Sequence, residues 1–395
     1  MINEKAYALG ATHNGIRELF EYSRRRAAQI GRENIFDYSL GNPSIPAPAA
    51  VNDAIRQILE QEDSLSVHGY TSTSGDPLAR QAIADDLNRR FSADARPEDL
   101  FLTAGAAPAL AAAFHALATP GAEVLAIAPF FPEYKPFAEA AGLSFRVVPA
   151  DVPDFQIRLD VLENMLTERT AAIVINSPNN PSGAVYTRDT LQKLADLLRS
   201  KAEEYGHPIY IIADEPYREL VYGDAQVSFI PNIYADTVVC YSYSKSLSLP
   251  GERIGYVCVP DNVDDAADVY AAVAGAARAM GHVCPPTLMQ LVIERCADEM
   301  PDLAAYDDNR TLLYNALTEM GYECAKPDGA FYLFVKAPNG DAVGFSQKAK
   351  LEHNLLVVPG AGFGCPGFMR LSYCVSGDMI RRSLPAFKAM IESYR

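Results

Sequence analysis

Short apolar runs alternate with longer stretches of helical periodicity from about residue 51 to residue 283. Several of these runs are continuous rather than alternating, which is typical of strands that are covered on both faces. Strand–helix alternation over this length predicts an α/β domain with a mostly parallel sheet. The expected strands are DLFLT, EVLAIA, SFRVVP, AAIVIN, PIYIIA, TVVCYS and RIGYVCV, and helices are expected at 77–91, 109–117 and 187–205.

The pattern changes after about Pro285 and predicts a smaller α+β lobe. Helices are expected there at 287–298, 304–320, 343–352 and from about 377, with the strands AFYLFV, LLVVP and FMRLSY. The first residues hold a helical stretch at 16–30, the strand IFDYSL and the irregular, Pro-rich GNPSIPAPAA. We expect this N-terminal segment to pack against the second lobe. The predicted domains are therefore 46–284 for the large one, and 1–45 with 285–395 for the small one.

Composition and charge argue against several kinds of partner, bound metal and cellular location. The net charge of −16 argues against nucleic acid or an anionic membrane as a partner. The seven cysteines form no C-x-x-C pair, which favours free thiols in a reducing compartment over disulfides or a zinc site. The start of the chain has no apolar signal-peptide region, and no apolar stretch reaches about 18 residues. We therefore expect a cytoplasmic protein without a metal.

Lys245 lies in the most informative turn of the chain. In SYSKSLSLPGERIGY a strand ends, a Ser-rich turn presents this lysine, and Arg253 follows before the next strand. A lysine that forms a Schiff base must be held rigidly and partly desolvated beside its carbonyl partner. The hydroxyls of Ser242 and Ser244 with the Arg253 guanidinium can bind a phosphate nearby. The alternative is a solvated surface lysine in a polar loop.

Two further motifs follow apolar strands, at the edge where open α/β sheets bind ligands. NSPNNPSG offers the amide of Asn180 to a phenolic oxygen, and ADEPY places Asp214 at a buried strand end with Tyr217 three residues later. A buried carboxylate needs a partner, and a protonated pyridine nitrogen is a suitable one. The alternatives are an asparagine chosen for its turn and an aspartate that caps one.

Two more segments contain groups that can bind an anion. Gly105, Ala106 and Ala107 follow a strand and precede a helix that we expect to open at about Pro108, so small residues and free N–H groups can approach an anion. Arg370 interrupts the apolar strand FMRLSY, and a buried arginine needs an anionic partner such as a carboxylate. A small-residue packing helix and a structural ion pair are the competing interpretations.

Taken in order, these motifs resemble the fold-type I pyridoxal-phosphate enzymes, and specifically the class I/II aminotransferase family that includes aspartate and aromatic aminotransferases. The matching segments span residues 40 to 373: LGNPSIPAP, HGYTSTSGDPLARQAI, TAGAA, APFFPEY, NSPNNPSG, ADEPY, SYSKSLSLPGERIGY, KPDGAFYLF, VVPGAGFG and MRLSY. The resemblance implies an α/β fold with a mostly parallel seven-stranded sheet in the large domain, a smaller α+β domain, and pyridoxal 5′-phosphate as the cofactor.

The resemblance also implies a role for each motif residue. Lys245 forms the Schiff base and moves the substrate proton, and Asp214 pairs with the pyridine nitrogen. Tyr217 and Asn180 bind the phenolic oxygen, and Phe131 stacks on the ring. The phosphate is held by the backbone at Gly105, Ala106 and Ala107 with Ser242, Ser244 and Arg253, while Tyr70 reaches the phosphate of a neighbouring subunit. The α-carboxylate of the substrate binds Arg370 with help from Gly41.

The implied reaction is amino transfer from an α-amino acid to a 2-oxo acid, with ping-pong kinetics and a homodimeric enzyme. Aspartate and 2-oxoglutarate are the default substrates, although the sequence identifies no second arginine for an acidic side chain. GAA lacks a hydroxyl that many relatives have, and Glu252 stands where an aromatic residue is frequent. Other chemistry on the same fold, such as a C–S β-lyase, decarboxylase or racemase, stays open. A non-catalytic regulator is disfavoured because only about 40 residues precede the motifs.

Overall fold

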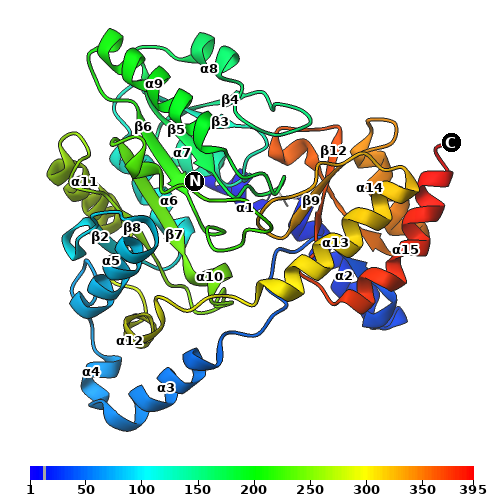
Figure 1. Cartoon of the computed structure of the whole chain (residues 1–395), viewed down its shortest axis with the longest axis horizontal. Helices are drawn as coiled ribbons and strands as arrows, with labels where there is room; N and C mark the ends of the chain where they lie inside the picture. The colour runs from blue at the N-terminus through cyan, green and yellow to red at the C-terminus, as the bar shows by residue number, and fades with distance from the viewer. Residues whose placement is uncertain (12–14) are drawn as a thin grey trace.

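A seven-stranded sheet forms the centre of the larger lobe (Figure 1). The computed structural model describes residues 1–11 and 15–395. The strand order is β2-β8-β7-β6-β5-β3-β4; both pairs made by β8 are antiparallel and the other pairs are parallel. The predicted mostly parallel sheet is therefore confirmed. Its strands are β2 (Leu100–Thr103), β3 (Glu123–Ile127), β4 (Ser144–Val148), β5 (Thr170–Asn176), β6 (Tyr210–Asp214), β7 (Thr237–Ser242) and β8 (Gly255–Cys258).

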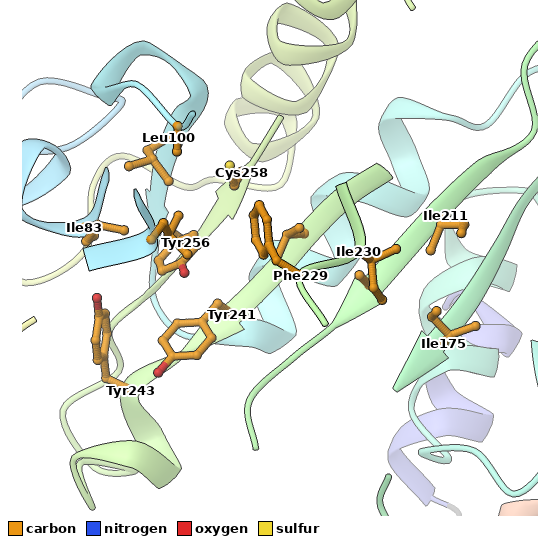
Figure 2. Packing of buried hydrophobic residues seen from close by; sticks show 14 of the residues in the cluster. Ile83, Leu100, Ile175, Ile211, Phe229, Ile230, Tyr241, Tyr243, Tyr256 and Cys258 are labelled. Carbon is orange, nitrogen blue, oxygen red and sulfur yellow. The ribbon is translucent and has the colours of Figure 1, made fainter. Parts of the chain in front are cut away.

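Both faces of this sheet are buried, which explains the continuous apolar runs. Ile173 and Ile175 of β5 enter one core cluster, while Ala172 and Val174 enter the other. Figure 2 shows part of the first cluster, where Tyr241 and Tyr256 lie on neighbouring strands. The helices of this lobe are α3 (Ala49–Gln61), α4 (Ser64–His68), α5 (Pro77–Phe91), α6 (Ala106–Ala116), α7 (Tyr134–Ala140), α8 (Leu159–Met165), α9 (Arg188–Tyr205), α10 (Tyr243–Ser246), α11 (Ala266–Ala279) and α12 (Thr287–Cys296).

The smaller lobe is built on an antiparallel sheet, β11-β12-β9, and a short parallel pair, β1 with β10. Strand β1 comes from the N-terminal segment, so that segment contributes a strand that pairs with β10 of the second lobe. Of the expected strand IFDYSL, only two residues pair. The elements of this lobe are α2 (Gly15–Ile30), β1 (Phe36–Asp37), α13 (Leu303–Met320), β9 (Tyr332–Lys336), α14 (Ala342–His353), β10 (Leu355–Leu356), β11 (Val358–Pro359), β12 (Phe368–Ser372) and α15 (Gly377–Glu392), and the exposed helix α1 (Glu4–Ala11) precedes them in the chain.

The predicted domain boundary near residue 285 stays a prediction. Helix α12, which follows that boundary, packs against α3 and α5 of the larger lobe. Its side chains Val292 and Ile293 belong to the core cluster of the seven-stranded sheet. The packing therefore favours a boundary after α12.

Three parallel strands of the large sheet end at the same edge. In the sheet, Asp214 of β6 lies beside Asn176 of β5 on one side and beside Cys240 of β7 on the other. Strand β7 continues to Ser242, where α10 begins. The polar groups that follow these strands are therefore brought to one place at the carboxyl edge of the sheet, where open α/β sheets bind ligands.

Candidate active site

Asp214 is a buried carboxylate with one satisfied and one free oxygen. Its side chain lies at the end of β6 and is 4% exposed. Oδ2 accepts a short hydrogen bond from the hydroxyl of Tyr134, whereas Oδ1 has no partner among the described residues. Burial raises the pKa of the Asp214 carboxyl to about 7, against the lowering effect of the Tyr134 hydrogen bond. A cationic ligand atom beside Oδ1 would restore the charged form.

Lys245 is held on the turn that follows β7. Ser242 caps α10 by accepting a hydrogen bond from the backbone N–H of Ser244, which fixes the direction of the turn. The Lys245 Nζ donates to the carbonyl of Gly41 at 2.6 Å and lies 5.4 Å from the centre of the Phe331 ring. Burial lowers the pKa of this amine to about 8. A lysine in this state loses its proton readily and can act as a nucleophile or base.

An anion-binding corner lies beside Lys245. The hydroxyls of Ser242 and Ser244 are 2.7 Å apart, and the Arg253 Nη1 approaches the Ser244 hydroxyl at 3.5 Å. Helix α6 begins at Ala106, two residues before the expected start, with Gly105 as its N-cap. A Cβ on Gly105 would lie 2.7 Å from Nη2 of Arg253, so the helix N-terminus and the guanidinium are close together. Hydroxyls, a guanidinium and helix N–H groups form a suitable site for a phosphate.

Replacing Gly105 tests this corner. Gly105 has φ +92°, and the added methyl of Gly105→Ala would displace Arg253. We expect cofactor binding to weaken roughly tenfold or more, since a hydrogen bond to a charged group contributes about 1.5–3 kcal/mol. Gly121→Ala is the matched control, because Gly121 also has positive φ (+82°) but its Cβ would meet nothing within 4 Å. Equal cofactor dissociation constants for the two variants would contradict the assignment.

Arg370 is a buried cation without an anionic partner in the described part of the chain. Its side chain lies on β12 and is 2% exposed. Nη1 donates to the side-chain oxygen of Asn180 at 3.1 Å, and Nη2 donates to the carbonyl of Ser39 at 2.6 Å. The guanidinium lies over the rings of Tyr332 and Phe363, at 4.7 and 5.1 Å. No ion pair of Arg370 is found among the described residues, which leaves its charge for an anionic ligand.

A hydrogen-bonded network joins these groups into one site. The Asn176 side chain donates to the carbonyl of Asp214 and accepts from the backbone N–H of Asn180, each at 2.7 Å. Asn180 in turn bonds Arg370, which bonds the carbonyl of Ser39. Two residues later, Gly41 receives the bond from Lys245. Residues from both lobes therefore meet at the carboxyl edge of the large sheet.

Two further predicted residues, Phe131 and Tyr70, differ in how far their rings are exposed to solvent. Phe131 is partly buried, with its ring 5.7 Å from that of Tyr134, whereas Phe130 is buried in the core and packs on Phe145. Partial exposure suits a ring that stacks on a ligand. Tyr70 is 89% exposed.

Three site residues were missed by the sequence-based prediction: Asn176, Tyr134 and Tyr332. Tyr134 bonds Asp214, and the Tyr332 hydroxyl lies 2.8 Å from that of Tyr217. All three lie within quoted motifs, but no feature of the sequence indicates these contacts between distant segments.

Cavity volume alone does not identify this site. A cavity of about 850 Å³ is lined by residues of both lobes, among them Phe155, Tyr314 and Lys326. None of the predicted site residues lines it. In the described part of the chain, no cluster of three metal-ligating side chains is found, and no helix has the length and apolar character to cross a membrane.

Comparison with known proteins identifies the family. Residues 33–387 match the family of class I and II aminotransferases. An aspartate aminotransferase of Thermotoga maritima is 31% identical over 91% of this chain and 92% of its own length. An aspartate/prephenate aminotransferase of Thermus thermophilus is 31% identical over 93% of this chain and 94% of its own.

Solved structures agree with these relatives. An amino transferase from Eubacterium rectale is 52% identical with a TM-score of 0.98, and the match covers 100% of this chain and 99% of that one. Aspartate aminotransferase from Thermus thermophilus with maleate is 27% identical with a TM-score of 0.86, covering 99% of both chains.

The chain thus belongs to the class I/II aminotransferases, enzymes with the fold-type I α/β architecture that use pyridoxal 5′-phosphate. It is an aminotransferase related to those named for aspartate and prephenate. The free buried oxygen of Asp214 and the close approach of Gly105 to Arg253 fit the pyridine nitrogen and the phosphate of that cofactor. The resemblance read from the motifs is confirmed.

Proposed function

We propose that this aminotransferase acts through Lys245 and takes an α-amino acid whose carboxylate binds Arg370. One observation carries the proposal. A buried carboxylate with a free oxygen (Asp214) and a buried guanidinium without an anion (Arg370) lie on one hydrogen-bonded network that ends beside the Lys245 amine. The free oxygen of Asp214 can bind the protonated ring nitrogen of the cofactor, and the Arg370 guanidinium can bind the carboxylate of the substrate.

The chain's own groups bind and orient the cofactor. When bound, pyridoxal 5′-phosphate supplies an aldehyde and an electron-withdrawing ring that weakens the bonds at the substrate Cα. Asp214 would pair with the protonated pyridine nitrogen. The positive charge on that nitrogen stabilises the charged form of the buried carboxylate, and the carboxylate in turn keeps the proton on the ring. Phe131 packs on the ring face, and Tyr217 with Asn180 binds the phenolic oxygen. The phosphate is bound by the N–H groups of Gly105, Ala106 and Ala107, the hydroxyls of Ser242 and Ser244, and Arg253.

Lys245 carries the covalent and proton-transfer steps. Its Nζ is the group that would hold the cofactor aldehyde covalently, with loss of water, and an incoming substrate amine would set it free again. Arg370, helped by the backbone at Gly41, fixes the substrate carboxylate, which sets the direction of the Cα–H bond. The free Lys245 amine is the base that would accept the Cα proton of the substrate and pass it to the cofactor. Water would release the donor as its 2-oxo acid while the amino group stays on the cofactor, and a second 2-oxo acid would then take up that amino group with return of the water.

Aspartate with 2-oxoglutarate is the default substrate pair, since relatives are named for aspartate. The test is a half-reaction: the holoenzyme is mixed with single amino acids in the absence of any 2-oxo acid. We expect the absorbance band of the Lys245-bound cofactor to disappear with the true donor and to return when a 2-oxo acid is added. Steady release of ammonia and pyruvate from cystathionine without an acceptor would instead favour a C–S β-lyase.

We also propose that the enzyme is a homodimer in which Tyr70 reaches the neighbouring active site. Its ring is 89% exposed, and the nearby Leu65 and Val283 are 83% and 57% exposed. The carbonyl of Gly69 accepts a bond from the hydroxyl of Thr287, so these exposed apolar groups lie on adjoining segments. Exposed apolar surface of this kind marks interfaces. Light scattering of the active enzyme should give twice the mass of the chain; a fully active monomer would contradict this arrangement.

A further inference from the structure

Tyr332, the first residue of β9, contacts three residues of the proposed site. Its hydroxyl oxygen is 2.8 Å from that of Tyr217, and its ring lies under the Arg370 guanidinium at 4.7 Å. A Cβ on Gly41 would lie 2.0 Å from the same hydroxyl, so the oxygen is packed directly against the Gly41 backbone. Tyr332 is 2% exposed.

The hydrogens of the Tyr217–Tyr332 pair can be assigned from its surroundings. Burial raises the pKa of Tyr332 to about 12 and that of Tyr217 well above its usual value, so both hydroxyls are protonated at neutral pH. Each hydroxyl carries one hydrogen and can accept others. Within the pair, therefore, only one oxygen donates and the other accepts. If Tyr217 donated to Tyr332, no hydrogen of Tyr217 would remain for a ligand.

The charge of Arg370 favours the opposite direction. Arg370 lowers the pKa of both tyrosines, but its guanidinium lies directly over the Tyr332 ring, so the Tyr332 hydroxyl is made the more acidic of the two and the better donor. Tyr332 also has no other hydrogen-bond partner among the described residues than Tyr217. Donation from Tyr332 to Tyr217 satisfies both groups and leaves the Tyr217 hydrogen free.

We propose that Tyr332 is a positioning residue that donates its hydrogen to Tyr217 and thereby directs the Tyr217 hydrogen toward the phenolic oxygen of the cofactor. This inference rests on the proposed function. In a chain of hydroxyls, accepting one hydrogen bond strengthens the bond that is donated next. Tyr332 therefore stabilises the negative charge on the phenolic oxygen through Tyr217 without touching the cofactor.

The test is a pH titration of the cofactor absorbance band in the absence of substrate. Stabilising the phenolate oxygen lowers the pKa at which this band changes. Removing the hydroxyl in Tyr332→Phe should raise that pKa by roughly 0.5 to 1, the effect expected of one neutral hydrogen bond. Tyr217→Phe should raise it further. The double variant should titrate like Tyr217→Phe alone, because Tyr332 acts only through Tyr217.

Tyr322→Phe is the matched control. Tyr322 is also a buried tyrosine of the smaller lobe, and its hydroxyl donates to the carbonyl of Phe387 at 2.8 Å. Loss of that bond should leave the titration unchanged. If Tyr332→Phe loads cofactor poorly, 3-fluorotyrosine at position 332 replaces it: a more acidic hydroxyl is a better donor and should lower the pKa of the band.

The outcomes separate this inference from the proposed function. A Tyr332→Phe enzyme that titrates like the wild type while Tyr217→Phe is shifted would overturn the role of Tyr332 alone. Additive shifts in the double variant would do the same. If neither variant shifts the band, Tyr217 does not bind the phenolic oxygen and the proposed site is itself wrong.

Discussion

Lys245→Ala is expected to remove transamination while the protein still folds. We expect kcat to fall by at least about 10⁴-fold, because proton transfer by a positioned side chain contributes about 10²–10⁴ and the covalent link is lost as well. The substitution deletes a partly buried amine that donates, among the described residues, to the carbonyl of Gly41. Because burial already lowers the pKa of that amine to about 8, its loss removes an unfavourable charge and should not destabilise the fold.

Borohydride reduction provides a readout that does not depend on turnover. The reagent fixes the cofactor covalently on the lysine that holds it, so the wild-type peptide containing Lys245 should gain the mass of the reduced cofactor. The Lys245→Ala enzyme should gain none. Lys336→Ala is the control, since Lys336 is a half-exposed lysine whose ion pair with Glu323 lies at the surface. Labelling of any other lysine, or turnover of Lys245→Ala within tenfold of wild type, would remove Lys245 from the mechanism.

The large sheet was predictable because its physical cause is local. A strand buried on both faces must be apolar at successive positions, and the runs around Ile173 and Ile211 have this character. Helix ends with a clear signal were also predicted: α5 begins at Pro77, after Asp76 caps it. Where such signals are weak, the prediction was less accurate. Helix α3 begins at Ala49, within a stretch expected to be irregular, because Pro48 lies just outside the helix and does not interrupt it.

The sequence allowed individual candidate residues of the site to be predicted, but not the contacts between them. The motifs identify Asp214 and Arg370 because each is a charged group in an apolar strand, which requires a partner. The contacts between Asp214 and Tyr134, and between Tyr217 and Tyr332, depend on how distant segments are placed by the sheet order and by the packing of the two lobes. A sequence without its fold gives no distance between such segments. For the same reason, the sequence left open whether Arg370 forms a structural ion pair, and the structure shows none among the described residues.

Arg370→Lys is expected to lose about 100-fold or more in kcat/KM for the amino donor. Truncating one member of a buried, hydrogen-bonded charge pair costs about 2–5 kcal/mol. Lysine keeps the positive charge but not the planar fork, whose Nη atoms bond Asn180 and Ser39 while Nε has no partner among the described residues. The rate of the first half-reaction, followed by the cofactor absorbance, measures the loss.

Arg310→Lys separates binding of the carboxylate from general damage to the smaller lobe. Arg310 is also buried, at 7% exposure, and its guanidinium bonds Asp307 and the carbonyl of Pro327. We expect this variant to unfold at a lower temperature but to keep its kcat/KM. A second comparison uses an amine that resembles the donor but lacks the α-carboxylate. Wild type and Arg370→Lys should react with it equally slowly, because the group that Arg370 binds is missing; a deficit of the same size as with the amino acid would mean that Arg370 supports the fold of the site and does not bind the substrate.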